Sequence, residues 1–224
     1  MKIVAVIPAY NEGGRIANSV RDAAQFVSAV VVVDDCSGDK TGEQAHEAGA
    51  YLLTHVINRG QGAALQTGTD FALRQLDAEI IVHFDADGQM RGSDIPAMVD
   101  PIERREVDVT LGSRYLGSAD NIPWDRRLVH KGAILFTYAL SGLRMTDAHC
   151  GFRALSAHAA RSIRITMNRM AHASEIPDQI AVKKLRYREV PVHIRYSDET
   201  LAKGQKTSAM FRVAYDFLRG KFIN

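Results

Sequence analysis

Residues 80–89 read IIVHFDADGQ, an apolar run that ends in two carboxylates one residue apart. Like charges placed this close are unfavourable unless a cation lies between them. Asp85, Asp87 and Gln89 all offer oxygen atoms, which are the ligands that Mg²⁺ and Mn²⁺ prefer. The alternative is a solvated turn that uses Asp and Gly for their loop preferences. The apolar run before the acids favours a metal site over a turn.

This stretch belongs to a repeating pattern in the first half of the chain. Short apolar runs predict strands at residues 2–7, 30–33, 51–54, 80–84 and 107–111. Helical patterns lie between them, at residues 15–27, 60–76 and 93–105 and from Thr41, which resembles a capping box with Gln44. The alternation predicts an α/β fold with a mostly parallel sheet flanked by helices. In such sheets ligands bind outside the carboxyl ends of the strands.

Polar side chains follow the first two predicted strands. In the stretch PAYNE after the first strand, Tyr10 could stack on a flat base and Glu12 could bind ribose, although loop packing explains Tyr10 equally well. Asp34 and Asp35 follow the second strand, where a carboxylate could accept bonds from a nucleobase or ribose. Turn formation and helix capping are the alternative for this pair, and each acid could serve one purpose. All these groups would open onto the same rim as Asp85.

The glycine-rich segment at residues 58–68, NRGQGAALQTG, opens a predicted helix. Backbone amides at the start of a helix attract phosphate. The segment is not a P-loop, because no Gly-Lys-Ser/Thr follows, and its spacing differs from the dinucleotide-binding fingerprint. It therefore adds a candidate phosphate contact without identifying a known nucleotide fold.

The second half of the chain is less regular and more basic. Its predicted elements are loops at residues 112–117, 121–127 and 146–153, a helix at 171–185, a strand at 187–196, a polar loop at 198–206 and an amphipathic helix at 211–222. Arginine binds phosphate oxygens in pairs and stays charged, so a basic cluster beside an acidic metal site suits a substrate with several phosphates. A single basic side chain, considered alone, is more often only surface charge. The basic residues are Arg114, Arg126, Arg127, Lys131, Arg153, Arg195, Lys203 and Lys206.

Composition narrows the class of protein. The 224 residues carry a formal net charge of +2, which gives no global signature of nucleic-acid binding. The two cysteines, Cys36 and Cys150, are too few for a disulfide framework, and we expect free thiols in a reducing cytosol. No second pair of ligands supports a zinc site near Cys150. No apolar run reaches the roughly 18 residues of a membrane-spanning helix, so we expect a cytoplasmic protein that can lie at the cytoplasmic face of the membrane.

Seven motifs occur together and in a fixed order. They are VIPAYNE, VVVDDCSGDKT, NRGQGAALQTG, HFDADGQ, LGSRYLG, TDAHCGFRAL and EVPVHIRY followed by KGQ. As a set they resemble the inverting glycosyltransferases of family 2, which have the GT-A fold. Within that family the pattern is most similar to dolichyl-phosphate mannosyltransferases and bacterial polyprenyl-phosphate glycosyltransferases. The resemblance implies a Rossmann-like GT-A domain at residues 1–206 with an appended amphipathic helix at residues 207–224.

The resemblance also implies roles for individual residues. The nucleotide-sugar would be bound by Pro8, Ala9, Tyr10, Glu12, Asp35, Asp85, Arg195, Lys203 and Gln205. A Mg²⁺ or Mn²⁺ ion would be held by Asp85, Asp87 and Gln89. Arg114 matches the arginine that contacts the acceptor phosphate, and Arg126 or Arg127 would supply a second contact. The loop after Arg195 is longer than the usual family loop, which leaves its contact residues open.

These expectations lead to three functional hypotheses. The first is transfer of a sugar from a UDP- or GDP-sugar to a polyprenyl phosphate of the undecaprenyl or dolichyl type. The second is a soluble transferase that glycosylates a hydroxyl group of a sugar or protein. It would need a general base, for which Asp147 is the candidate. For Glu175, a second candidate, charge on a helix surface is the favoured interpretation. The third is a nucleotide-sugar-binding module without catalysis, against which the intact acidic and basic motifs argue.

The last segment bears on the acceptor. The membrane helices of many bacterial relatives have no counterpart in the sequence, so access to a lipid would need the terminal helix or a membrane partner protein. Met210, Phe211, Ala214, Phe217 and Leu218 can share one helix face, with Arg212, Arg219 and Lys221 nearby. That pattern fits a helix lying on acidic lipid headgroups. Packing against the domain itself or in a homodimer is the alternative.

Overall fold

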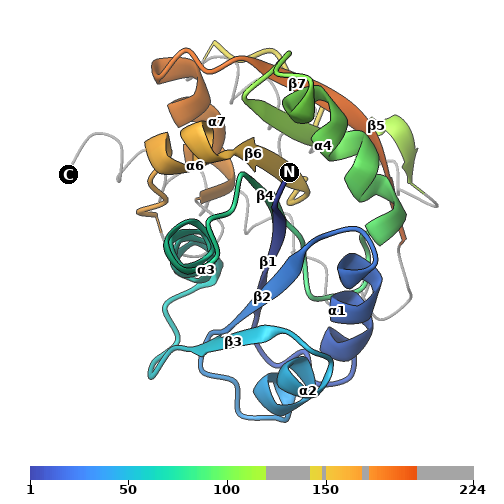
Figure 1. The fold of residues 1–224 in the computed structure, drawn as a ribbon, viewed down its shortest axis with the longest axis vertical. Coiled ribbons are helices and arrows are strands. Elements are labelled where there is room, and N and C mark those ends of the chain that lie inside the picture. Colours follow the sequence, from blue (N-terminus) through green and yellow to red (C-terminus); the bar gives the residue numbers. More distant parts are fainter. Residues whose placement is uncertain (120–141, 148–149, 168–171, 196–224) are drawn as a thin grey trace, which may run out of the picture.

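The structure, a computed structural model, describes residues 1–119, 142–147, 150–167 and 172–195. A seven-stranded sheet with the order β3-β2-β1-β4-β6-β5-β7 runs through the domain (Figure 1). Its neighbouring strands are parallel except where β6 pairs with β4 and β5. The predicted α/β fold with a mostly parallel sheet is confirmed. The strands are β1 (Ile3–Ala9), β2 (Ala29–Asp34), β3 (Tyr51–Thr54), β4 (Ile80–His83), β5 (Val109–Ala119), β6 (Arg153–Ser156) and β7 (Tyr187–Ile194).

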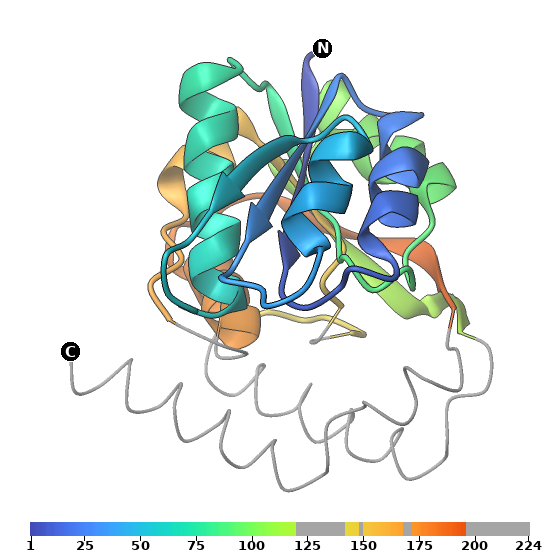
Figure 2. The same ribbon diagram turned by 90° about the horizontal axis from the view of Figure 1, so that it is seen from below.

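Helices cover both faces of this sheet, as Figures 1 and 2 show from two directions. One layer consists of α1 (Ile16–Ala24), α2 (Thr41–Glu47) and α4 (Ile95–Glu103), which follows the short 3-10 turn η1 (Gly92–Asp94). The other layer consists of α3 (Gln61–Gln75), α6 (Ala157–Ser162) and α7 (His172–Val182). The result is the three-layer arrangement that parallel sheets require.

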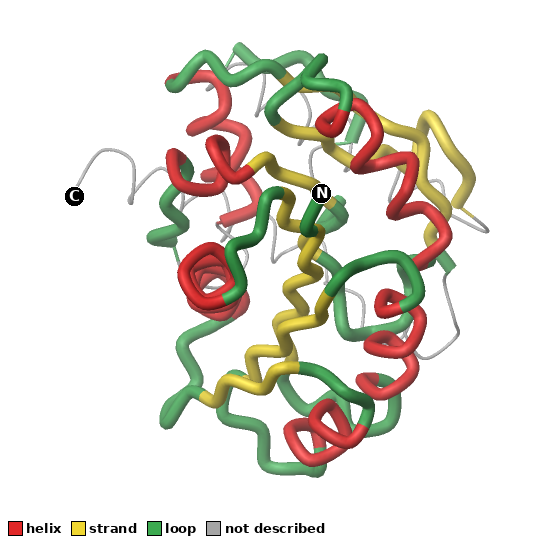
Figure 3. Tube along the Cα trace, viewed as in Figure 1, coloured by secondary structure: helices red, strands yellow, loops and turns green. Residues whose placement is uncertain are grey.

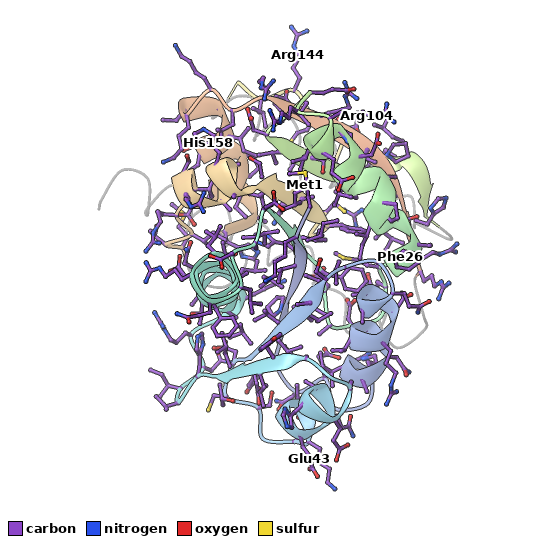
Figure 4. All side chains as sticks on the ribbon, viewed as in Figure 1. Met1, Phe26, Glu43, Arg104, Arg144 and His158 are labelled. Atoms are coloured by element: carbon purple, nitrogen blue, oxygen red, sulfur yellow. The ribbon has the colours of Figure 1, made fainter. Side chains whose placement is uncertain are left out.

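The central strands are apolar on both faces because each face has its own core. In β1, Ala5 and Ile7 belong to the core under α1 and α4, while Val4 and Val6 belong to the core under α3 and α7. Side chains fill the space between the layers, and labelled charged residues such as Glu43 and Arg104 project outward at the periphery (Figure 4). The continuous apolar runs of the sequence therefore reflect burial on two sides.

Helix α3 lies very close to the sheet. A Cβ atom added to Gly68 would come within 2.4 Å of a methyl carbon of Val6. Only glycine fits this contact without moving β1 or α3. The close approach fixes the middle of α3 relative to β1 and β2.

Two strands of the second half differ from the sequence prediction. The segment GSRYLG, predicted to be a loop, continues β5 as far as Ala119 beside β7, with a register shift between Ser113 and Ser118. Gly117 allows this pairing, since a Cβ there would lie 2.2 Å from the carbonyl oxygen of Val192. Strand β6 was not predicted, because it begins with an arginine directly after a glycine-containing loop and resembles a continuation of that loop. Figure 3 shows the strand and loop path of this half.

The structure also bears on the predicted helix cap, the two cysteines and membrane-spanning helices. The capping box at Thr41 is wrong: Lys40 precedes α2 without a side-chain cap, and the Thr41 hydroxyl accepts a bond from the Glu12 amide at 2.8 Å. Cys36 and Cys150 are free thiols, as expected. Within the described ranges, no helix is both long and apolar enough to cross a membrane. The predicted loop at 198–206 and helix at 211–222 lie outside the described residues.

Candidate active site

The first, second and fourth strands end at a common rim of the sheet. Strand β1 lies between β2 and β4, so the strand order reverses there, which is where α/β sheets bind ligands. The amide of Asp35 donates to the carbonyl of Ala9 at 2.9 Å, and the amide of Phe84 donates to the carbonyl of Val6 at 3.0 Å. These bonds bring the PAYNE, DD and DADGQ motifs together at one rim, as the sequence predicted.

The loop after β1 is held in place by the loop after β2. Asn11, at φ 54°, accepts a bond from the amide of Gly38 at 2.9 Å. Glu12 forms an ion pair with Arg15 at 2.6 Å, and the side chain of Tyr10 stays half exposed. Pro8 and Ala9, predicted to line the nucleotide pocket, are the last two residues of β1. The exposed ring of Tyr10 is therefore presented on a rigid turn.

The two acids after β2 have different surroundings. Asp34 accepts a bond from the amide of Ser37 at 3.0 Å, which is the turn-forming role. Asp35 is buried and accepts bonds from the amides of Arg59 at 2.8 Å and Gly60 at 2.6 Å, with a third contact to His55 at 2.7 Å. The anion at the start of α3 is thus Asp35, which occupies two of the amides expected to attract phosphate.

The acidic pair after β4 carries uncompensated charge. Burial and the neighbouring Asp87 raise the pKa of Asp85 to about 7, against opposing effects of Arg153 and Arg114. Burial also raises the pKa of Asp87, whose carboxylate accepts a bond from the amide of Gln89 at 3.0 Å. Two acids that resist ionisation side by side favour the binding of a cation.

The donor set at this position suits a hard divalent ion. It consists of two carboxylates and the amide oxygen of Gln89, and Mg²⁺ commonly takes one or two carboxylates together with substrate phosphates. The described ranges contain no cluster of three or more His, Cys, Asp or Glu residues arranged around a metal, so protein ligands alone do not complete a site. The residues therefore fit an ion that shares its ligands with a phosphorylated substrate.

Gln61 and Gly151 contact the carboxylate of Asp85. Gln61, the first residue of α3, donates to Asp85 at 3.1 Å. A Cβ on Gly151, in the loop before β6, would lie 2.5 Å from the Asp85 carboxylate, so a side chain there would displace that carboxylate. The sequence analysis assigned neither residue, because each acts through a contact between segments distant in the chain.

The end of β7 lies at the same rim. The amide of Arg195 donates to the carbonyl of Gln89 at 2.9 Å, which places the predicted donor-binding arginine next to the acidic loop. Lys203, Gln205, Arg126 and Arg127 lie outside the described residues. Their predicted contacts stay predictions.

Arg114 and Asp147 form a buried ion pair. The Nε atom of Arg114 donates to Oδ2 of Asp147 at 2.6 Å and its Nη2 atom donates to Oδ1 at 2.7 Å, while its amide donates to Oδ2 at 3.1 Å. The Asp147 side chain is 0% exposed and that of Arg114 is 12% exposed. The structure thus joins the predicted phosphate-binding arginine to the candidate base.

Glu175, the second candidate base, is buried, and its alternative interpretation as helix-surface charge is wrong. Its carboxylate accepts bonds from the amide and hydroxyl of Thr166 at 2.9 and 2.6 Å and from the amide of Met167 at 2.9 Å. These bonds hold the segment before α7. A helical pattern alone gave no sign that this acid faces inward.

Arg153, which the sequence placed in a basic loop, is instead buried in β6 beside His83 of β4. Burial lowers the pKa of Arg153 and lowers that of His83 to about 3. Within the described part of the chain, Nη1 of Arg153 has no hydrogen-bond partner. Its positive charge acts on the acidic pair from within the sheet, where it lowers the pKa of Asp85.

Residues 4–164 match the family model described as glycosyl transferase family 2. An uncharacterized protein of Methanocaldococcus jannaschii is 32% identical over 99% of this chain and 93% of its own. The UDP-N-acetylglucosamine–dolichyl-phosphate N-acetylglucosaminyltransferase of Methanococcus voltae is 29% identical over 96% of this chain and 94% of its own. Among solved structures, Mycobacterium tuberculosis glucosyl-3-phosphoglycerate synthase with Mn²⁺, UDP and phosphoglyceric acid superposes with a TM-score of 0.74 at 15% identity, covering 97% of this chain and 76% of that one.

Proposed function

Because this chain belongs to glycosyl transferase family 2 and is a glycosyltransferase, we propose that it transfers a sugar from a UDP- or GDP-sugar to a polyprenyl phosphate, with inversion at the anomeric carbon. The relative from Methanococcus voltae is named for a UDP-sugar donor and a dolichyl-phosphate acceptor over nearly the same length, which supports this reaction class.

The observation that carries the proposal is the environment of Asp147. A hydroxyl acceptor needs a general base, and a base must reach the proton that it removes. Both carboxylate oxygens of Asp147 accept bonds from Arg114, and its side chain is 0% exposed. A phosphate acceptor is ionised near neutral pH and needs no base, only cationic partners that hold it in line. The pairing of Arg114 with Asp147 supports a phosphate acceptor.

The proposed donor lies at the rim formed by β1, β2 and β4. Tyr10 would cover the base, and Glu12 and Asp35 would bind the nucleoside side of the pocket. Asp85, Asp87 and Gln89 would hold Mg²⁺ or Mn²⁺, which would neutralise charge on the donor diphosphate. The amide of Arg195, bonded to the Gln89 carbonyl, puts a cationic side chain in reach of the same region.

In the proposed reaction an oxygen of the acceptor phosphate attacks the anomeric carbon of the donor sugar. The bond between that carbon and the diphosphate oxygen breaks, and the nucleoside diphosphate leaves with the electron pair. Arg114 would orient the attacking phosphate, with Arg126 or Arg127 as a second contact. Stabilising the leaving diphosphate is where electrostatic catalysis has the largest effect.

The test is incubation of the full chain with labelled UDP- and GDP-sugars, Mn²⁺ or Mg²⁺, and undecaprenyl phosphate. The proposal expects labelled sugar that extracts into organic solvent and requires the metal. Label transferred only to water-soluble hydroxyl acceptors would favour the soluble transferase instead. Donor binding by calorimetry without turnover on any acceptor would favour a binding module.

We also propose that residues 207–224 bring the domain 1–206 to the cytoplasmic face of the membrane. The basis is the sequence pattern, in which Arg212, Arg219 and Lys221 accompany an apolar helix face. Deletion of residues 207–224 should reduce co-sedimentation with anionic vesicles and leave donor binding unchanged. Unchanged sedimentation would refute this, and a change of oligomeric state in the truncated chain would assign the segment to a homodimer.

A further inference from the structure

Glu189 of β7 accepts hydrogen bonds from the segment that leads into the ion pair of Asp147 with Arg114. Its two carboxylate oxygens accept bonds from the amide of Thr146 at 2.7 and 2.8 Å. Its Oε1 atom also accepts from the Thr146 hydroxyl at 3.0 Å and from the Asp147 amide at 3.1 Å. A single carboxylate therefore holds two successive residues of this segment.

The same segment is tied to β5 on its other side. The hydroxyl groups of Thr146 and Ser113 lie 2.6 Å apart, and Ser113 is buried immediately before Arg114. Strands β5 and β7 are parallel neighbours, with Leu111 opposite Glu189. Thr146 is thus bonded to both strands at once, which fixes the direction in which the chain continues to Asp147.

From this fixed position Asp147 reaches Arg114. The bonds from Nε and Nη2 form a side-on pair, which sets the plane of the guanidinium as well as its position. A continuous set of bonds therefore runs from Glu189 through Thr146 and Asp147 to the guanidinium of Arg114.

We propose that Glu189, acting through Thr146 and Asp147, is a positioning residue that orients the guanidinium of Arg114 toward the phosphate group of the acceptor. This inference rests on the proposed function, since the anion to be oriented is the acceptor phosphate. It assigns Asp147 a positioning role rather than that of a base. Small errors in orientation are costly, because a displacement of about 1 Å can reduce turnover on the order of 100-fold.

The chain contains a chemically matched control. Glu175 accepts bonds from the amide and hydroxyl of Thr166 and from the amide of Met167, the same pattern that Glu189 makes with Thr146 and Asp147. Neither of the two residues that Glu175 holds, Thr166 and Met167, is Arg114's ion-pair partner, which is Asp147. Glu189→Gln and Glu175→Gln therefore make the same chemical change at two carboxylates with the same kinds of donor, since an amide nitrogen replaces one accepting oxygen in each.

The experiment measures steady-state kinetics of the full chain with farnesyl phosphate as a short acceptor and a saturating nucleotide-sugar. Glu189→Gln should lower kcat/KM for the acceptor by about 10-fold and leave the KM of the donor within about 2-fold of wild type. Glu175→Gln should lower Tm to a similar extent without this selective loss. Equal effects of the two variants on the acceptor, or a donor KM that changes as much as the acceptor term, would overturn the proposal.

A second measurement does not depend on turnover. The Nε–H resonance of Arg114, assigned by its loss in Arg114→Lys, should be sharp in wild type and in Glu175→Gln, and broadened or shifted in Glu189→Gln. An Arg114 resonance that is unchanged in Glu189→Gln would overturn the positioning role. Wild-type protein that forms no lipid-linked sugar would instead overturn the proposed function, while this resonance still reports on the positioning.

Discussion

Two aspartate–arginine pairs in this molecule make the same bonds, one at the start of β5 and one in the middle of that strand. Arg186 donates to Asp108 from its amide at 2.9 Å, from Nε at 3.1 Å and from Nη2 at 2.9 Å. Arg114 donates to Asp147 from the same three atoms. The arginine side chain is 57% exposed in the Arg186 pair and 12% exposed in the Arg114 pair.

The difference between the pairs lies in their surroundings. Water screens the Arg186 pair, which ties the start of β5 to the turn before β7, and exposed pairs of this kind contribute little to stability. The Arg114 pair is removed from water, so loss of one partner leaves an uncompensated buried charge. Although the two pairs have the same bonds, their different exposure predicts that the Arg186 pair is tolerant of substitution and that the Arg114 pair is sensitive to it.

The largest effect should be on catalysis. Arg114→Lys keeps the charge but loses the planar side-on contact, so we expect activity toward the lipid acceptor to fall on the order of 100-fold. Arg186→Lys makes the same chemical change and should retain wild-type activity. Initial rates of lipid-linked sugar formation check both, and equal rates in the two variants would remove the distinction between the pairs.

The next effect is on stability. Asp147→Ala leaves Arg114 buried without its carboxylate and should cost about 3 kcal/mol. For a chain of this size that corresponds to a Tm lower by roughly 6–12 °C. Asp108→Ala should stay within about 2 °C of wild type. Thermal unfolding followed by circular dichroism measures both values, and a larger loss in Asp108→Ala would reverse the ranking.

The stability of the protein should depend on pH through Asp85, whose pKa the charge of Arg114 lowers. The pKa of Asp85 is raised to about 7 in the folded chain, above the unfolded value of about 3.9, so the folded state holds the proton longer. Stability should therefore fall as pH rises from about 4 to about 7, by about 2 kcal/mol after allowance for solvent screening. Asp85→Asn should remove this decline, as measured by urea unfolding across the pH range.

Loss of Arg114 sharpens the same measurement. The Arg114 charge lowers the pKa of Asp85, so Arg114→Gln should extend the decline in stability to higher pH. Arg186 pairs with Asp108 at the start of β5, away from Asp85, so Arg186→Gln should leave the pH range of the Asp85-dependent decline in stability unchanged. A shift of that profile in Arg186→Gln would show that the two pairs are not independent.

The smallest effect concerns the exposed pair. Its hydrogen bonds with Arg186 lower the pKa of Asp108 below its ordinary value. Its contribution to stability is present above the unfolded pKa and is lost as pH falls through the lower folded pKa. The small Tm difference of Asp108→Asn should therefore disappear below about pH 3 and also in high salt. A difference that persists in both conditions would mean that the pair is not screened.

The sequence predicted the features that depend on local pattern. Apolar runs ending in acids marked β1, β2 and β4, and the rule for parallel sheets brought Ala9, Asp35 and Asp85 to one rim. Strand β3 was predicted with its observed bounds. The predictions of β1, β2 and β4 succeeded because burial on both faces leaves a continuous apolar signal in a single strand.

The features that the sequence did not predict depend on contacts between distant segments. Asp147 and Arg114 are 33 residues apart, and Glu189 lies 42 residues beyond Asp147. Arg153 looked like surface charge because its neighbours are glycine, phenylalanine and alanine, a context that fits a loop as well as a buried strand. Strand β6 resembles a continuation of the glycine-containing loop before it, so the register that buries Arg153 was not visible.

The antiparallel strand β6 separates two parts of the sheet. On one side, β1 to β4 carry every described residue proposed for the base, the ribose and the metal, and on the other side β5 and β7 carry Arg114 and Glu189. Between these halves lies the short reversed strand β6, and Gly151, just before it, lies against Asp85. Such a division permits modular change: exchanging β5 and β7 for the strands of another transferase should redirect the sugar to a different acceptor, while the loops after β1, β2 and β4 keep their register.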